Sequence, residues 1–149
     1  IPYLYNYAGQ PWKTQKRIRV LLDEWFRNDL MGVPGDEDGG GMSAFVVFSM
    51  MGFYPVTPGS PTYNIGSPVF SDVKIDLGNG NVFEIVADDA THDNKYVQSV
   101  TLNGEELNRP WFDHSRISAG GVLSLKMGPK ANKEWGVGNP PPSVGPKQQ

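Results

Sequence analysis

The sequence predicts an α+β fold in which helices occupy the first third of the chain and short strands the remainder. Apolar residues recur with a helical period before residue 52, and they alternate with polar residues from about residue 58 onward. Asn-Gly pairs separate the alternating segments, as they do in antiparallel hairpins. This change of period favours two domains, joined at about residues 57 to 60.

The first predicted helix covers residues 11 to 31. Pro11 suits the first helical position, and Gly32 with Pro34 is expected to end the helix. Apolar side chains fall at i, i+3, i+4, i+7 and i+8, which is the pattern of one helix face. These residues are Ile18, Leu21, Leu22, Trp25 and Phe26.

The second predicted helix covers residues 42 to 51 and ends at Gly52 and Pro55. It is apolar on nearly every face, so it must be buried on all sides. One amphipathic neighbour cannot supply that cover. We therefore expect residues 1–57 to be a slice of a larger helical domain, whose remainder lies upstream of Ile1.

The alternating segments predict a small antiparallel β-sandwich over residues 58–138. Turns are expected at Gly78 to Asn81 and at Asn103 with Gly104. The Pro-rich segment 139–149 is predicted to be disordered. The predicted strands lie around residues 73–77, 83–85, 100–102 and 123–127.

Composition excludes several classes of function. A net charge of -3 and a pI near 5.3 argue against a nucleic-acid partner, since a binding surface must neutralise phosphates. The longest apolar run, residues 44 to 56, is too short and interrupted to span a membrane. The absence of cysteine excludes disulfides and thiolate metal sites, and His92 with His114 does not make a zinc site.

The segment VPGDEDGGGMSAF, residues 33 to 45, places Asp36, Glu37 and Asp38 between turn residues and an apolar helix. One interpretation is a solvated acidic loop that caps the helix. The other is a site that uses carboxylates. A calcium loop of the EF-hand type fails, because Gly40 and Val47 stand where ligands are needed.

A phosphate cradle is excluded because no Lys follows the glycines and the carboxylates would repel an anion. No G-x-S-x-G pattern surrounds Ser43, so a serine nucleophile has no support. Acid–base work by paired carboxylates survives. In an inverting glycosidase a carboxylate base faces a protonated acid roughly 6.5–9.5 Å away, and a second carboxylate can position the water.

Four segments, in the same order along the chain, resemble the C-terminal part of glycoside hydrolase family 92. The resemblance covers roughly residues 1 to 138. The segments are YLYNYAGQPWKTQ (residues 3–15), GDEDGGGMSAF (35–45), GFYPVTPGSPTYNIGSPVF (52–70) and VTLNGEELNRPWFDHSRISAGGVLSLKMGPKAN (100–132).

The resemblance implies an inverting, calcium-dependent exo-α-mannosidase that acts on mannose-containing glycans. The fold it implies is the last helices of an (α/α)6 barrel followed by a small antiparallel β-sandwich region. The general base falls on Asp38, assisted by Asp36. The triplet's Glu37 is a candidate for substrate binding. Trp12 and Asn6 are further candidates, with the alternative that they fill the wall of the barrel.

By the same resemblance, the general acid and most calcium ligands lie upstream of Ile1, so no metal ligand is assigned here. Loss of one member of an acid–base pair lowers the rate about 10²–10⁴-fold. We therefore expect the isolated chain to be nearly inactive and to need the missing N-terminal portion as its partner. Gly39 to Gly41 and Phe45 depart from many relatives, which have Gln and Trp in this region.

Two alternatives remain open at this point. The chain could be a non-catalytic carbohydrate-binding module on the β-sandwich, using Tyr96, Trp111 and Phe112. It could also be a structural fragment that completes a partner polypeptide. The acidic pI and the resemblance together suggest an exported bacterial protein, either periplasmic or secreted.

Overall fold

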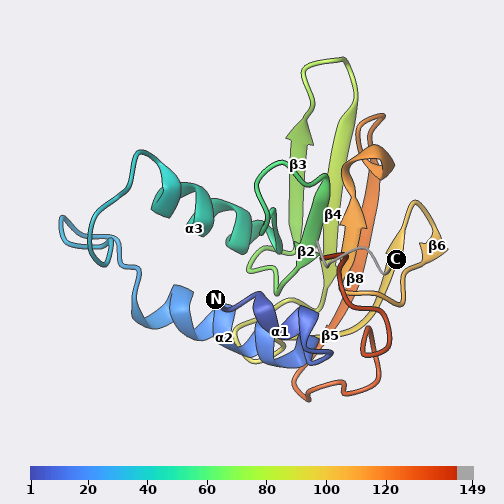
Figure 1. Cartoon of the computed structure of the whole chain (residues 1–149), viewed down its shortest axis with the longest axis horizontal. Coiled ribbons are helices and arrows are strands. Elements are labelled where there is room, and N and C mark those ends of the chain that lie inside the picture. The colour runs from blue at the N-terminus through green and yellow to red at the C-terminus, as the bar shows by residue number, and fades with distance from the viewer. Residues whose placement is uncertain (144–149) are drawn as a thin grey trace, which may run out of the picture.

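The computed structural model describes residues 1–143, in which helices lie beside a β-region made of two sheets (Figure 1). The helices are α1 (Leu4–Tyr7), α2 (Pro11–Glu24) and α3 (Gly41–Met51), with a short 3-10 turn η1 (His114–Arg116) in the β-region. The strands are β1 (Phe53–Tyr54), β2 (Thr62–Ile65), β3 (Asp72–Asp76), β4 (Val82–Asp88), β5 (Tyr96–Leu102), β6 (Glu105–Glu106), β7 (Trp111–Asp113) and β8 (Gly121–Gly128). None of the helices within these residues has the length and apolar character needed to cross a bilayer.

Two sheets form the β-region, and the predicted sandwich is confirmed. A three-stranded sheet has the order β1-β2-β7, and a five-stranded sheet has the order β3-β4-β8-β5-β6. All pairs are antiparallel except β4 with β8, which run parallel with Ile85 opposite Leu123. The parallel pair arises because β8 enters between β4 and β5, a strand order that alternation alone does not reveal.

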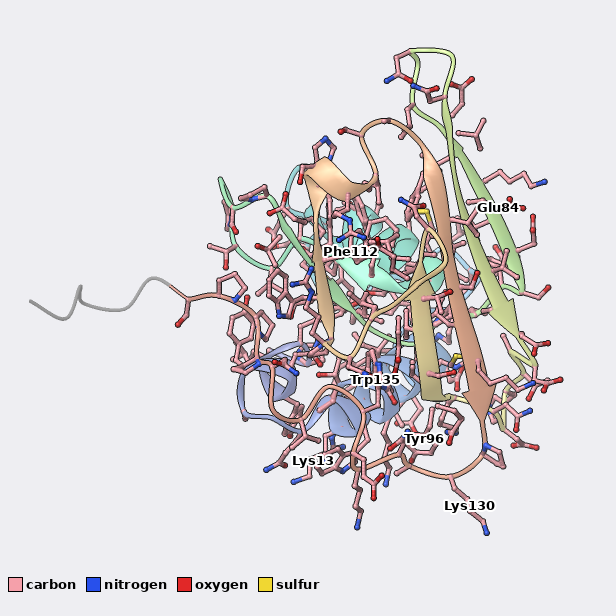
Figure 2. All side chains as sticks on the ribbon, turned by 90° about the vertical axis from the view of Figure 1, so that its right-hand side faces the viewer. Lys13, Glu84, Tyr96, Phe112, Lys130 and Trp135 are labelled. Atoms are coloured by element: carbon pink, nitrogen blue, oxygen red, sulfur yellow. The ribbon has the colours of Figure 1, made fainter. Side chains whose placement is uncertain are left out.

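Three phenylalanines join the two sheets at the centre of the core. The ring of Phe53 in β1 lies 5.7 Å from that of Phe112 in β7 and 6.3 Å from that of Phe83 in β4. Figure 2 shows Phe112 inside the fold, whereas Lys13 and Lys130 point outward. Aromatic pairs in such tilted arrangements stabilise a core beyond their buried area alone. The alternation seen in the sequence therefore corresponds to one inward face per strand.

The prediction that the first helix reaches Met31 is wrong, because α2 ends at Glu24. After Phe26 the sequence has no further apolar residue on the packed face until Leu30. The side chain of Asp29 accepts a hydrogen bond from the backbone N–H of Met31 at 2.8 Å, a local turn that competes with helix. Residues 25–40 are thus a long loop that leads to α3.

The faces of α3 are unequally covered, although its sequence is apolar nearly all round. On the covered side the ring of Phe48 lies 5.3 Å from that of Phe53, and the hydroxyls of Ser49 and Tyr3 are 3.2 Å apart. On the other side Val47 remains 55% exposed. Apolar residues of α2, α3 and the loop also line a groove of about 730 Å³. Residues 1–143 therefore leave apolar helix surface without a neighbour.

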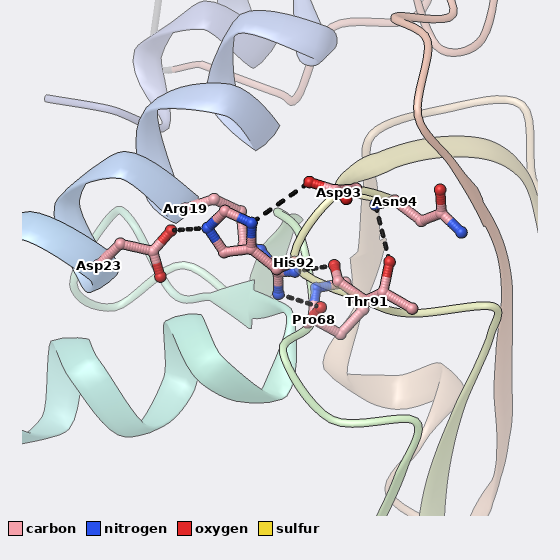
Figure 3. Close-up of polar contacts among 7 residues, drawn as sticks. All are labelled: Arg19, Asp23, Pro68, Thr91, His92, Asp93 and Asn94. Atoms are coloured by element: carbon pink, nitrogen blue, oxygen red, sulfur yellow. Dashed lines mark hydrogen bonds and ion pairs between the residues drawn. The ribbon is translucent and has the colours of Figure 1, made fainter.

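Buried polar side chains connect the helices to the β-region. Arg19 of α2 is only 3% exposed, and it donates hydrogen bonds to the backbone oxygens of Pro68, at 2.9 Å, and of Thr91 (Figure 3). Burial lowers the pKa of Arg19 below its ordinary value, and nearby Asp23 partly opposes this effect. Gln15 accepts a hydrogen bond from the backbone N–H of Val97 at 3.2 Å. Gln15 thus fixes α2 against β5, and Arg19 fixes it against the loops that follow β2 and β4.

His92 forms a second, exposed connection between α2 and the loop after β4. Its Nε2 lies 3.3 Å from a carboxylate oxygen of Asp23, and its Nδ1 lies 3.4 Å from one of Asp93 (Figure 3). All three side chains are largely solvent-exposed, and such surface pairs contribute about 0–1 kcal/mol. Arg19 rather than His92 therefore holds the two regions together.

The segment predicted to be disordered begins at Asn139, which packs on the β-region. Its backbone oxygen accepts a hydrogen bond from the indole N–H of Trp111 at 3.2 Å, and its amide donates to the backbone oxygen of Asn108 at 3.0 Å. Pro141 is buried. Residues 139–141 are thus held by the fold, while residues 144–149 lie outside the described part of the chain.

Candidate functional site

Residues 36–40, here called the acidic turn, are the last part of the loop between α2 and α3. They lie at the end of the molecule away from β6 (Figure 1). Asp36 and Asp38 are exposed, and Glu37 is partly buried. No hydrogen bond or ion pair within residues 1–143 engages the carboxylates of Asp36 or Asp38. Two carboxylates therefore face solvent on either side of a third that is differently placed.

Glu37 caps α3. One of its carboxylate oxygens accepts a hydrogen bond from the backbone N–H of Ser43 at 2.9 Å, and the other accepts from that of Gly40. Hydrogen bonds from Ser43, and then from Gly40, hold the pKa of Glu37 below its ordinary value. Glu37 therefore forms a helix cap, and it supplies the hydrogen bonds that Gly40, which has no side chain, cannot provide.

Three consecutive residues of the turn have left-handed backbone conformations. Asp38 has a φ of 57°, Gly39 of 63° and Gly40 of 95°. An L-residue in this conformation costs roughly 1–2 kcal/mol, which glycine avoids. Asp tolerates it better than most residues. The left-handed backbone therefore favours glycine at positions 39 and 40. Gly41 is the first helical residue and has no such requirement.

Gly40 and Gly41 provide a matched pair for a stability prediction. Gly40→Ala is expected to lower the free energy of unfolding by about 1–2 kcal/mol, because its φ is positive. Gly41→Ala is expected to raise it by about 0.5–1 kcal/mol, since a Cβ there meets only Asp38, at 3.9 Å. Thermal denaturation of the two variants checks both signs. Equal effects would contradict the left-handed turn.

Of the other candidates, Asn6 is fully buried and Trp12 is half-buried. The Asn6 amide donates to the side chain of Asn64 at 3.2 Å and to the backbone oxygens of Ile65 at 3.0 Å and Pro110 at 3.2 Å. These contacts tie α1 to the three-stranded sheet. The structure thus keeps Asn6 within the packed interior and does not bring its side chain to the acidic turn.

The groove beside α3 is lined by side chains from all three α-helices and from the loop between α2 and α3. Tyr5, Arg17 and Trp25 line it, together with Pro34 and Met42 from either side of the acidic turn. Trp25 is 58% exposed, although the helical period placed it on the packed face of α2. Because α2 ends at Glu24, Trp25 does not belong to the packed face of the helix. Asn28 and Asp29 are the residues in the sequence that signal this early end.

The described residues do not form a calcium cage. Calcium takes six to eight oxygen ligands, yet residues 1–143 contain no group of three or more His, Asp or Glu side chains placed to hold a metal ion. Both carboxylate oxygens of Glu37 are already engaged by backbone N–H groups. No catalytic step is therefore assigned to a metal held by these residues.

Comparisons with known proteins agree on one family. Residues 1–129 match the model of the glycosyl hydrolase family 92 catalytic domain. The chain is 39% identical over 148 residues to an uncharacterized secreted glycosidase from Arthroderma benhamiae, covering 96% of this chain and 19% of that protein.

Solved structures give the same result. A family GH92 α-mannosidase from Bacteroides thetaiotaomicron superposes with a TM-score of 0.90 at 37% identity, covering 96% of this chain and 19% of that one. An inverting GH92 mannosidase from the same organism superposes with a TM-score of 0.89 at 43% identity, covering 95% and 20%. The chain thus spans about a fifth of the length of these relatives. It belongs to glycosyl hydrolase family 92.

Proposed function

We propose that this chain is the C-terminal part of an inverting, calcium-dependent exo-α-mannosidase that removes terminal mannose from glycans. The carrying observation is the acidic turn, in which Asp36 and Asp38 are free while Glu37 is committed to the helix cap. Family membership and the solved mannosidases of 37% and 43% identity support the substrate class.

In the proposed reaction Asp38 is the general base. Its carboxylate removes a proton from a water molecule whose oxygen attacks the anomeric carbon, while Asp36 orients that water. The bond to the leaving oxygen breaks at the same time, and a protonated carboxylic acid from outside these residues donates a proton to that oxygen. The attack comes from the face opposite the leaving group, so the released mannose has the inverted configuration.

Residues 1–57 would then belong to an (α/α)6 barrel and residues 58–138 to the β-region beside it. The uncovered apolar side of α3, with Val47 exposed, supports this assignment because the remaining helices of a barrel would cover it. So does Leu30, whose apolar side chain is fully exposed in the loop before α3. The N-terminal portion is accordingly the proposed partner.

The alternative of a carbohydrate-binding module on the β-region is less well supported. Phe112 is fully buried, and the guanidinium of Arg109 lies 4.1 Å from the ring centre of Trp111, so it covers one face of that ring. Trp111 also donates its indole N–H to Asn139. A sugar-stacking platform needs an open aromatic face, whereas Phe112 has none and Arg109 occupies one face of Trp111.

The experiment that tests this function measures mannose release from an α-mannobiose in the presence of calcium. The chain is assayed alone and together with the N-terminal portion of the enzyme. Activity only in the mixture, abolished by a chelator, is the expected result. Activity of the chain alone would contradict the split site, with Glu24 and Glu37 the first acids to examine.

The name of the secreted relative supports an exported protein.

A further inference from the structure

The first turn of α3 is held almost entirely by two residues of the acidic turn. The backbone N–H of Gly41 donates to the backbone oxygen of Asp38 at 3.3 Å, and that of Met42 donates to the backbone oxygen of Glu37 at 3.1 Å. The Glu37 side chain accepts from Ser43 and Gly40. Every N–H that would be unpaired at this helix start is thus satisfied from residues 37 and 38.

This arrangement makes the turn a closed loop rather than a free one. The left-handed residues 38–40 reverse the chain, and the Glu37 side chain bridges the reversal to the helix beyond it. The helix itself is fixed at its far end, where Ser49 contacts Tyr3 and the Phe48 ring packs on Phe53. The turn is therefore attached to a packed element, although the side chains of Asp36 and Asp38 are exposed.

The positions of Asp36 and Asp38 depend directly on this attachment, since each is bonded to Glu37 through a single peptide. We propose that Glu37 is a positioning residue, whose side chain holds the turn on α3 so that Asp36 and Asp38 stay in one geometry. The proposal deepens the proposed function and rests on it. It gives Glu37 a different role from the substrate-binding one expected from the sequence, and the two roles compete for the same two oxygens.

The test uses Glu37→Gln and Glu37→Ala in the complete polypeptide, with Glu134→Gln as an exposed control in the β-region. A misplacement of about 1 Å at a catalytic group can lower the rate about 10²-fold. We expect kcat to fall about 10-fold for Gln, which keeps one acceptor, and about 100-fold for Ala. The value of KM is expected to change less than about threefold, and the control to leave both constants unchanged.

Two further readouts separate positioning from other roles. Both variants should be assayed below their melting temperatures, so that a lower kcat does not report unfolding. The acidic limb of the pH–rate profile is expected to persist with a lower plateau, because the proposed general base is still present in both variants. The melting temperature of Glu37→Gln is expected to lie below that of the wild type at pH 7. The difference should shrink as the pH falls below the ordinary pKa of a glutamate, because the unfolded chain then takes up a proton that folded Glu37, with its lowered pKa, does not yet bind.

Unchanged kcat in a folded Glu37→Ala variant would overturn the proposal. A large rise in KM with normal kcat would also overturn it and would assign Glu37 to substrate binding. Loss of the acidic limb would place Glu37 in the chemistry itself. If Asp38→Asn kept full activity, the proposed function would fail whatever the Glu37 variants do. An inactive Asp38→Asn beside a fully active Glu37→Ala would remove only the positioning role.

Discussion

Replacing Asp38 by Asn in the complete enzyme is expected to lower kcat for α-mannoside hydrolysis by about 10²–10⁴-fold, the loss typical of a general base. The amide has nearly the same size as the carboxylate but cannot take a proton from water. Asn also tolerates the left-handed backbone that residue 38 adopts, so the turn should keep its shape. The measurement is steady-state kinetics together with the melting temperature, which should change little.

Asp29→Asn is the matched control, because Asp29 is an exposed aspartate of the same loop. It pairs with Arg27 at 3.3 Å and accepts from the backbone N–H of Met31, a bond that an amide oxygen retains. Its kcat should stay close to that of the wild type. Equal rates for Asp38→Asn and Asp29→Asn would exclude Asp38 as the base and leave the acidic turn as a capping loop.

Replacing Arg19 by Met is expected to have the largest effect on stability, lowering the free energy of unfolding by about 2–4 kcal/mol. Hydrogen bonds to charged groups contribute about 1.5–3 kcal/mol each, while the burial of a charge offsets part of this. Met fills a similar volume but leaves the backbone oxygens of Pro68 and Thr91 without their donor. Chemical denaturation of the variant measures the loss.

Lys16→Met on the same helix is the control, because Lys16 is exposed and makes no ion pair within residues 1–143. Its effect should stay within about 0.5 kcal/mol. If the two variants unfold at the same denaturant concentration, the guanidinium bonds of Arg19 contribute nothing net. A smaller slope of the free energy of unfolding against denaturant concentration, seen for Arg19→Met alone, would instead indicate that the helices unfold separately from the β-region.

Local signals in the sequence predict most elements of the fold. Gly52 ends α3 as expected, since its φ of 103° is left-handed and a Cβ there would lie 2.8 Å from Pro68. Strand alternation places Phe83 and Ile85 on the buried face of β4. The helical period does not predict where α2 ends, because the period continues weakly beyond Glu24. The end depends instead on the polar turn at Asp29, which competes with the helix.

The candidate site was found in the sequence as a cluster, but its division of roles was not. Three adjacent carboxylates look alike in the sequence, and only the backbone path separates them. The left-handed turn brings the Glu37 side chain back to the N–H groups of Gly40 and Ser43 and leaves its neighbours free. The buried role of Asn6 was likewise hidden, because its partners lie 58 to 104 residues further along the chain.

The placement of β8 has a consequence for how the protein folds. This strand is the last one within residues 1–143, yet it lies between β4 and β5 in the centre of the five-stranded sheet. During synthesis the pairs β3-β4 and β5-β6 cannot join into one sheet until residues 121–128 have emerged, so the edges of β4 and β5 stay unpaired until then. Such non-local pairing slows folding, and open edges invite wrong partners. A nascent chain that stalls before Gly121 would therefore expose the unpaired edges of β4 and β5, and we expect chaperones to protect this state from aggregation.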